Sequence, residues 1–396
     1  MIAPASRLDG IQEYYFATKL REIAQMRAEG HPVINLGIGS PDLPPHPDVV
    51  EALHTSAADP AAHGYQSYTG LPVLRRAWAD WYARHYGVSI APDQEVLPLI
   101  GSKEGIAHIA FTFLESGDEA LVPNPGYPTY RAATRLTGAE VREYTLDERH
   151  KWLPDLDALA GADLSKVKVM WINYPHMPTG AAADAGFFEE VVAFGKAHKI
   201  LIVNDNPYSF ILNDRPLSIL AARDAFDIAL ELNSLSKSHN LAGWRLGALL
   251  GKGRYLSEVL RFKSNLDSGQ FQAVQLAAAK ALAADESWYR ELNDQYRLRQ
   301  QKAVAVMRMA GCQVPEGQQG MFVWGRIPAQ YPDAYSLSDR LLYDARVFLT
   351  PGGIFGSAGE QYLRISLCQP VAVFEEALER VRQMSISSHT QPLQTA

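Results

Sequence analysis

Short apolar runs alternate with helix-forming segments between about residues 96 and 250. The strands expected from these runs are 96–100, 119–122, 167–172 and 200–203, and the helices expected between them include 101–114 and 187–198. The run at 200–203 is apolar at every position, which is typical of a parallel strand buried on both faces. The alternation therefore predicts an α/β fold with a mostly parallel sheet.

Both ends of the chain are expected to contribute helices and short strands. Helices are expected at 15–26, 47–57, 71–86, 287–309, 337–344 and 373–384, and strands at 33–36, 321–324 and 362–367. The chain after Gly247 is expected to become helical, and the tail 385–396 to be disordered. A chain of 396 residues is too long for one small core and is expected to form two or three domains.

The stretch 234–247 contains a single lysine, Lys237, among small hydroxyl residues, and Arg245 follows in a Gly-Trp-Arg-Leu-Gly turn. An amine with small neighbours can approach an aldehyde closely and form a Schiff base, provided that its surroundings favour the neutral amine. Hydroxyl groups and an arginine suit a phosphate. The stretch therefore predicts a site for pyridoxal phosphate (PLP), with Lys237 on its aldehyde and Ser234, Ser236 and Arg245 around its phosphate. An ordinary surface lysine beside an ion-paired arginine would not account for the rest of the motif.

A glycine-led turn before the helix at 101–114 offers a second anion site. The first backbone N–H groups of a helix have no partners within it, and together with the positive end of the helix dipole they attract a bound anion. Many turns between a strand and a helix share this pattern, so the signal is weak by itself. Combined with the stretch 234–247, it predicts that Gly101, Ser102 and Lys103 complete the phosphate site.

A carboxylate is expected at the same site, because Asp205 follows the apolar strand 200–203 and ligands meet α/β sheets at the carboxyl ends of parallel strands. Taken in order, these stretches resemble the class I/II aminotransferases, which are fold-type I PLP enzymes of the aspartate aminotransferase-like superfamily. The resemblance covers the chain from about residue 34 to residue 380. It implies a large PLP-binding domain, expected at 47–289. It also implies a small α+β domain, expected from the N-terminal arm 1–46 together with 290–396.

The resemblance also implies roles for individual residues. Asp205 keeps the pyridine nitrogen of PLP protonated, Tyr208 bonds the phenolic oxygen, and Tyr127 covers the face of the ring. Gly39 lies beside the carboxylate of the substrate. Arg364 binds that carboxylate through two nitrogens, which a lysine could not do as well.

A homodimer with its active sites at the interface is a further implication of the resemblance. In the family, the tyrosine five residues before a glycine reaches across the interface to the partner's cofactor phosphate. Tyr65, which precedes Gly70, holds that place here.

One position departs from the family pattern. The family has Asn-Pro-Thr-Gly, and its asparagine bonds the phenolic oxygen of PLP, but this sequence has Met177 before Pro-Thr-Gly. A methionine side chain has no hydrogen-bond donor of this kind. Either Tyr208 is left as the main donor, or the neighbouring His176 turns inward and replaces the asparagine.

Three basic residues bear on the choice of substrate. Lys103 resembles a lysine that reaches the distal carboxylate of the substrate in some bacterial members of the family. Arg261 and Lys263 lie in a region that can contribute to the site from the partner chain. These residues favour an acidic substrate such as glutamate or aspartate, although a solvated Lys103 is an equally good interpretation.

The composition excludes several classes of protein. A net charge of −7 leaves no excess of basic residues to neutralise nucleic-acid phosphates. Two cysteines do not form a disulfide framework, and the sequence shows neither a signal-peptide core at its start nor an apolar run of membrane-spanning length. We therefore expect a cytoplasmic protein that binds no nucleic acid, no membrane and no metal.

Three functions compete on these observations. The favoured one is an aminotransferase that moves an amino group from an L-amino acid to a 2-oxo acid, with Lys237 moving the proton at the substrate's Cα. A PLP-dependent carbon–sulfur lyase would use the same lysine motif, and conversion of the cofactor to its pyridoxamine form would distinguish the two. A non-enzymatic effector domain of a transcription regulator would need a DNA-binding extension, and the N-terminal segment is short and not basic.

Overall fold

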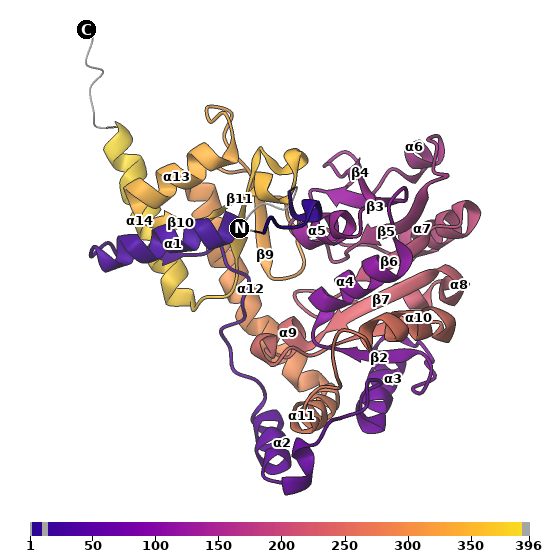
Figure 1. Ribbon diagram of the computed structural model, residues 1–396. Helices are drawn as coiled ribbons and strands as arrows, with labels where there is room; N and C mark the ends of the chain where they lie inside the picture. Colours follow the sequence, from indigo (N-terminus) through magenta and orange to yellow (C-terminus); the bar gives the residue numbers. More distant parts are fainter. Residues whose placement is uncertain (1, 10–14, 390–396) are drawn as a thin grey trace.

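The computed structural model describes residues 2–9 and 15–389, and the largest sheet within them has seven strands in the order β2-β8-β7-β6-β5-β3-β4 (Figure 1). These strands are β2 (Val96–Leu99), β3 (Glu119–Asn124), β4 (Glu140–Thr145), β5 (Val167–Ile172), β6 (Leu201–Asp205), β7 (Ala229–Ser234) and β8 (Gly247–Gly251). Neighbouring strands are parallel except where β8 runs antiparallel to β2 and to β7. The predicted α/β fold with a mostly parallel sheet is therefore confirmed.

Helices cover both faces of this sheet, because successive side chains of each strand point to opposite faces. Val169 and Trp171 of β5 share a core with α4, α5 and α10, whereas Met170 and Ile172 share a core with α3, α7 and α11. The bounds of these helices are α3 (Pro72–Tyr86), α4 (Ser102–Phe113), α5 (Pro128–Leu136), α7 (Ala185–His198), α10 (Gly253–Lys263) and α11 (Gln272–Leu282). With both faces covered, the strand ends are the places left for a ligand.

A smaller unit, on the left of Figure 1, is built from both ends of the chain. Its antiparallel sheet has the order β11-β12-β9, and beside it β1 pairs in parallel with β10. Its elements are α1 (Tyr15–Ala28), β1 (Ile34–Asn35), β9 (Phe322–Arg326), α13 (Ala334–Ala345), β10 (Val347–Phe348), β11 (Thr350–Pro351), β12 (Tyr362–Ser366) and α14 (Val371–His389). The predicted small α+β unit is therefore confirmed.

The long helix α12 (Glu286–Met309) joins the two parts. Near its start, the Asn293 side chain accepts a hydrogen bond from the backbone nitrogen of Leu212 at 2.6 Å. Further along, Arg299 binds the carboxylate of Asp42 with two nitrogens, at 2.6 and 2.9 Å. This helix therefore fixes the smaller unit against the main sheet.

Two expectations about these elements are wrong, and two strands of the main sheet, β4 and β7, were not predicted. The edge strand β4 gives no strand signal, because most of its side chains are partly or fully exposed and form no apolar run. The chain after Gly247 first forms β8, whose apolar side chains are buried between β2 and β7, and turns helical only at Gly253. Helix α14 continues to His389, so the first part of the expected disordered tail is helical, and 390–396 lie outside the described residues.

Four further α-helices complete the described chain. They are α2 (Pro47–Ala57), α6 (Leu156–Ala160), α8 (Ala225–Ile228) and α9 (Leu235–Ser238). Of these, α2 packs against α11. Cys312 and Cys368 are buried free thiols. Within 2–9 and 15–389, we find no helix that combines the length and the apolar character needed to cross a bilayer.

Candidate active site

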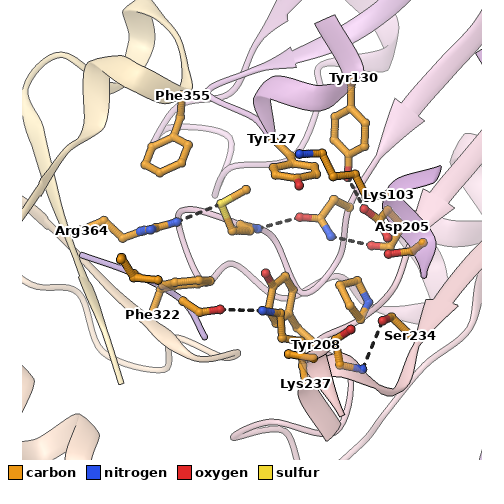
Figure 2. A pocket seen from close by; sticks show the side chains of 18 of the residues that line it. Lys103, Tyr127, Tyr130, Asp205, Tyr208, Ser234, Lys237, Phe322, Phe355 and Arg364 are labelled. Carbon is orange, nitrogen blue, oxygen red and sulfur yellow. Dashed lines mark hydrogen bonds between the residues drawn. The ribbon is translucent and has the colours of Figure 1, made fainter. Parts of the chain in front are cut away.

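A cavity of about 560 Å³ lies where the carboxyl ends of β6 and β7 meet the N-terminus of α4 (Figure 2). Most of the residues that the sequence singled out line it together: Gly39, Ser102, Lys103, Tyr127, Asp205, Tyr208, Ser234, Ser236, Lys237, Arg245 and Arg364. Of the other predicted residues, Gly101 lies directly behind Arg245, and Tyr65 points into solvent with 97% of its surface exposed.

Lys237 stands on α9, the single helical turn that follows β7. Its Nζ donates a hydrogen bond to the backbone oxygen of Gly39 at 2.6 Å, which brings a loop 198 residues earlier to the same point. Burial lowers the pKa of the Lys237 amine, and the positive charges of Arg364 and Arg245 lower it further. A larger neutral fraction of this amine is what a Schiff-base nucleophile and a proton-transfer base require.

Asp205, the last residue of β6, is buried at the floor of the cavity. Burial raises the pKa of its carboxyl to about 7, although the hydrogen bond that it accepts from Tyr130 lowers that pKa. The Tyr130 hydroxyl lies 2.8 Å from Oδ2, while Oδ1 has no hydrogen-bond partner among the described residues. A buried carboxylate oxygen without a partner is costly, so its natural complement is a bound donor such as a protonated pyridine nitrogen.

One end of the cavity is formed by the start of α4 and the turn around Arg245. Gly101 has a φ of 82°, and a Cβ at this position would lie 2.3 Å from an Nη of Arg245. A side chain there would therefore collide with the guanidinium that the sequence assigns to the phosphate. In the same cavity, the Ser234 hydroxyl accepts a hydrogen bond from the backbone nitrogen of Ser236 at 3.2 Å.

Two tyrosines face the middle of the cavity, as Figure 2 shows. Tyr127 packs edge-on against Tyr130, with ring centroids 5.6 Å apart, and Tyr208 packs edge-on against Phe322 at 5.8 Å. Burial raises the pKa of both phenols, so each hydroxyl keeps its proton at neutral pH and is available as a donor.

The His176 side chain lies outside the cavity. Its Nδ1 is 2.8 Å from the Thr179 hydroxyl, and the residue is absent from the cavity walls. Burial lowers the pKa of His176 to about 3, so the ring is neutral. Met177 lines the cavity instead, and its sulfur accepts a hydrogen bond from Arg364 at 3.4 Å. Of the two alternatives for the phenolic oxygen, Tyr208 is the one whose side chain faces the cavity.

The expected contribution of Lys263 to a partner's substrate site is wrong. Lys263 is 2% exposed, and its amine is 2.5 Å from Asp267 of the same chain, beside a buried cluster with Glu104 and His108. Arg261 does point outward, but it pairs with Glu258 at 2.7 Å and lies outside the cavity.

Several cavity residues could not be found from the sequence. Besides Tyr130, they include Leu20, Ile38, Asn173, Phe322 and Phe355. They belong to common core types, and no motif marks them. The Asn173 side chain, which begins the loop to Gly180, donates to the backbone oxygen of Asp205 and accepts from the nitrogen of Met177 at 2.8 Å.

The fold and the cavity together define a class of protein, the fold-type I enzymes that depend on PLP. Two observations show that the residues present fit this cofactor. The buried Asp205 oxygen lacks a donor, and Gly101 has no side chain that would collide with the guanidinium of Arg245. Residues 31–381 match the family model described as aminotransferase class I and II. The chain belongs to this family and is a PLP-dependent aminotransferase.

Known relatives are similar over nearly the whole chain. An LL-diaminopimelate aminotransferase of Dehalococcoides mccartyi is 42% identical over 386 residues, which is 97% of this chain and 99% of the relative. Another, from Moorella thermoacetica, is 40% identical over 382 residues, 96% of this chain and 98% of the relative. Among solved structures, substrate-bound BacF from Bacillus subtilis superposes with a TM-score of 0.93 at 36% identity, covering 97% of this chain and 98% of that one.

Proposed function

We propose that this aminotransferase uses a donor amino acid with a distal carboxylate, with LL-diaminopimelate as the first candidate, and a 2-oxo acid as acceptor. The observation that carries the proposal is that Lys237, Arg364 and Lys103 all line the same cavity. Relatives named for LL-diaminopimelate, at about 40% identity over the whole chain, support the choice of donor. Lys103, exposed at the cavity wall, supplies the positive charge that a distal carboxylate needs.

The proposed roles at the cofactor follow from the geometry. PLP, when bound, supplies an aldehyde and an electron-withdrawing ring. The start of α4 at Gly101 and Ser102 holds the phosphate together with Ser234, Ser236 and Arg245. Such a site combines the backbone N–H groups at a helix start with the positively charged guanidinium of an arginine.

The remaining roles concern protons and the substrate. The Asp205 carboxylate holds the proton on the pyridine nitrogen, the Tyr208 hydroxyl donates to the phenolic oxygen, and Tyr127 covers the ring. Arg364 binds the α-carboxylate, which the amino acid and the 2-oxo acid have in common. The Nζ of Lys237 accepts the proton from the substrate's Cα, and its lowered pKa favours the neutral form of the amine that this transfer requires.

A panel of amino acids tests the choice of substrate. We expect LL-diaminopimelate to convert the bound cofactor to its pyridoxamine form faster than L-alanine does, as followed by the visible absorbance. Lys103→Ala should raise KM for LL-diaminopimelate and L-glutamate about tenfold, because one charge-assisted bond is lost. The KM for L-alanine should remain nearly unchanged. Lys166→Ala, at an exposed lysine outside the cavity, is the matched control. Equal losses for alanine and glutamate would contradict the proposed role of Lys103.

We also propose a homodimer in which Tyr65 reaches the phosphate site of the partner. The support is its 97% exposed ring, on a loop that is held in place by a bridge between Gln66 and Gly269. Tyr65→Phe should weaken cofactor binding without changing the mass measured by light scattering, and a monomeric mass for the wild type would contradict the proposal.

The proposed domains are a large one at 47–289 and a small one formed by 1–46 and 290–396. The main sheet lies within the first range, and the β1–β10 pair joins the two parts of the second. A cytoplasmic location is proposed on the two buried free thiols, Cys312 and Cys368.

A further inference from the structure

Arg364 is held between two aromatic rings. It is 4% exposed, and its guanidinium carbon lies 4.0 Å from the centroid of Phe322 and 4.6 Å from that of Phe355. In Figure 2 the two rings lie on opposite sides of the arginine, with Phe355 above it and Phe322 below. A guanidinium close to aromatic faces is attracted by the ring quadrupoles, and the attraction is greatest where water is excluded.

Two further contacts lie at the edge of the guanidinium. One Nη donates to the backbone oxygen of Gly37 at 2.7 Å, and the other donates to the sulfur of Met177 at 3.4 Å. A thioether is a weak acceptor, so a carboxylate arriving from the cavity replaces it with little loss. The arginine is therefore held by its faces and presents an edge to the cavity.

Both rings are themselves fixed in place. A Cβ at Gly39 would lie 2.5 Å from the tip of Phe322, so the ring packs closely on this glycine. Phe355 is 1% exposed, and its backbone oxygen accepts a hydrogen bond from Gly126, the residue before Tyr127. Neither ring can turn away from Arg364 without disturbing its surroundings.

We propose that Phe322 and Phe355 are positioning residues for carboxylate recognition, which hold the plane of the Arg364 guanidinium so that a bidentate carboxylate needs no rearrangement of the arginine. The inference depends on the proposed role of Arg364 as the α-carboxylate site. It explains why two phenylalanines of common core type lie against the arginine in the cavity wall. It also predicts that a change in either ring alters the binding of the amino acid and of the 2-oxo acid by a similar factor, because both carry the same α-carboxylate.

The first experiment separates ring electrostatics from packing. Phe355 is replaced by phenylalanines with increasing numbers of ring fluorines, which weaken the ring quadrupole while keeping nearly the same size. The PLP-loaded protein is then titrated with butyrate, which has no amino or oxo group to react, and with neutral butyramide. We expect butyrate affinity to fall stepwise with fluorination, by roughly tenfold in total, and butyramide to show no trend.

The second experiment uses ordinary substitutions. Phe322→Leu and Phe355→Leu should each raise KM for the amino acid and for the 2-oxo acid by a similar factor of about ten, with a smaller change in kcat. Phe374→Leu makes the same change at a fully buried ring outside the cavity, and should alter stability without altering KM.

The outcomes distinguish the inference from the role on which it depends. If Arg364→Lys leaves butyrate affinity unchanged, the proposed role of Arg364 is wrong, and the inference is wrong with it. If Arg364→Lys weakens butyrate while fluorination at Phe355 produces no trend, Arg364 binds the carboxylate but the rings do not position it. A stepwise fall in butyrate affinity with fluorination, together with weaker butyrate binding by Arg364→Lys, supports both the role of Arg364 and the positioning role of the rings.

Discussion

The hydrogen bond from Tyr130 to Asp205 offers a sharp test of how the protein holds the cofactor ring. Tyr130 is fully buried, stacks on Trp171 with ring centroids 5.3 Å apart, and donates to Asp205 at 2.8 Å. Tyr130→Phe removes the hydroxyl and keeps the ring. The change should therefore affect the charge of Asp205 and leave the packing around it in place.

The size of the effect follows from the energy of one bond. A hydrogen bond to a charged group contributes about 1.5–3 kcal/mol, and about 1.4 kcal/mol corresponds to one pKa unit. The pKa of Asp205, about 7 in the wild type, should rise by roughly one to two units in Tyr130→Phe. At pH 7.5 the ionised fraction of Asp205 would then fall from about three-quarters to between about a quarter and a thirtieth.

The assay is calorimetric titration of the cofactor-free protein with pyridoxamine phosphate, which forms no Schiff base with Lys237. If binding requires the ionised carboxylate, affinity in Tyr130→Phe should be weaker by roughly three- to twenty-fivefold at pH 7.5, and the deficit should shrink as the pH rises above about 9. The titrations of the ligand itself are common to both proteins and cancel in the ratio.

Tyr144→Phe is the matched control. The Tyr144 hydroxyl is buried and donates to the backbone oxygen of Trp171 at 2.6 Å, so this variant loses a bond of similar burial that does not involve Asp205. A deficit of the same size in both variants, or one that does not change with pH, would refute the reasoning.

Three further predictions concern the same cavity. Borohydride reduction of the loaded enzyme followed by peptide mapping should place the phosphopyridoxyl group on Lys237, and a label on any other lysine would overturn the central assignment. Tyr208→Phe should raise the pH midpoint of the cofactor's visible absorbance by about one to two units, because a donor to the phenolic oxygen stabilises its anion. Met177→Asn adds such a donor and should lower the midpoint. A midpoint that shifts only in His176→Ala would contradict this assignment. In the cofactor-free protein, the folded-state pKa of Asp205 lies above its unfolded value, so its contribution to the free energy of unfolding should decrease as the pH rises from about 4 through 7. Asp205→Asn should remove that decrease in thermal unfolding, and parallel pH profiles for the two proteins would contradict it.

The sequence was sufficient for those parts of the site whose signal is local. The apolar run at 200–203 ending near Asp205, the glycine before Ser102, and the hydroxyl residues around Lys237 each lie within a few positions of one another. Strand and helix periodicity is a property of neighbouring residues, because it reflects which faces of one element are buried. The alternation of strands and helices and the residues proposed for the phosphate site could therefore be predicted before any long-range contact was known.

The tertiary structure decided how residues of ordinary type are used. Tyr130 reaches Asp205 across 75 positions, and Arg364 reaches Met177 across 187. Lys263 looked like a substrate contact, yet folding buries it against Asp267. A phenylalanine or a lysine has the same chemistry in a core and at a binding site, so only its neighbours in space, and the water that they exclude, determine its role.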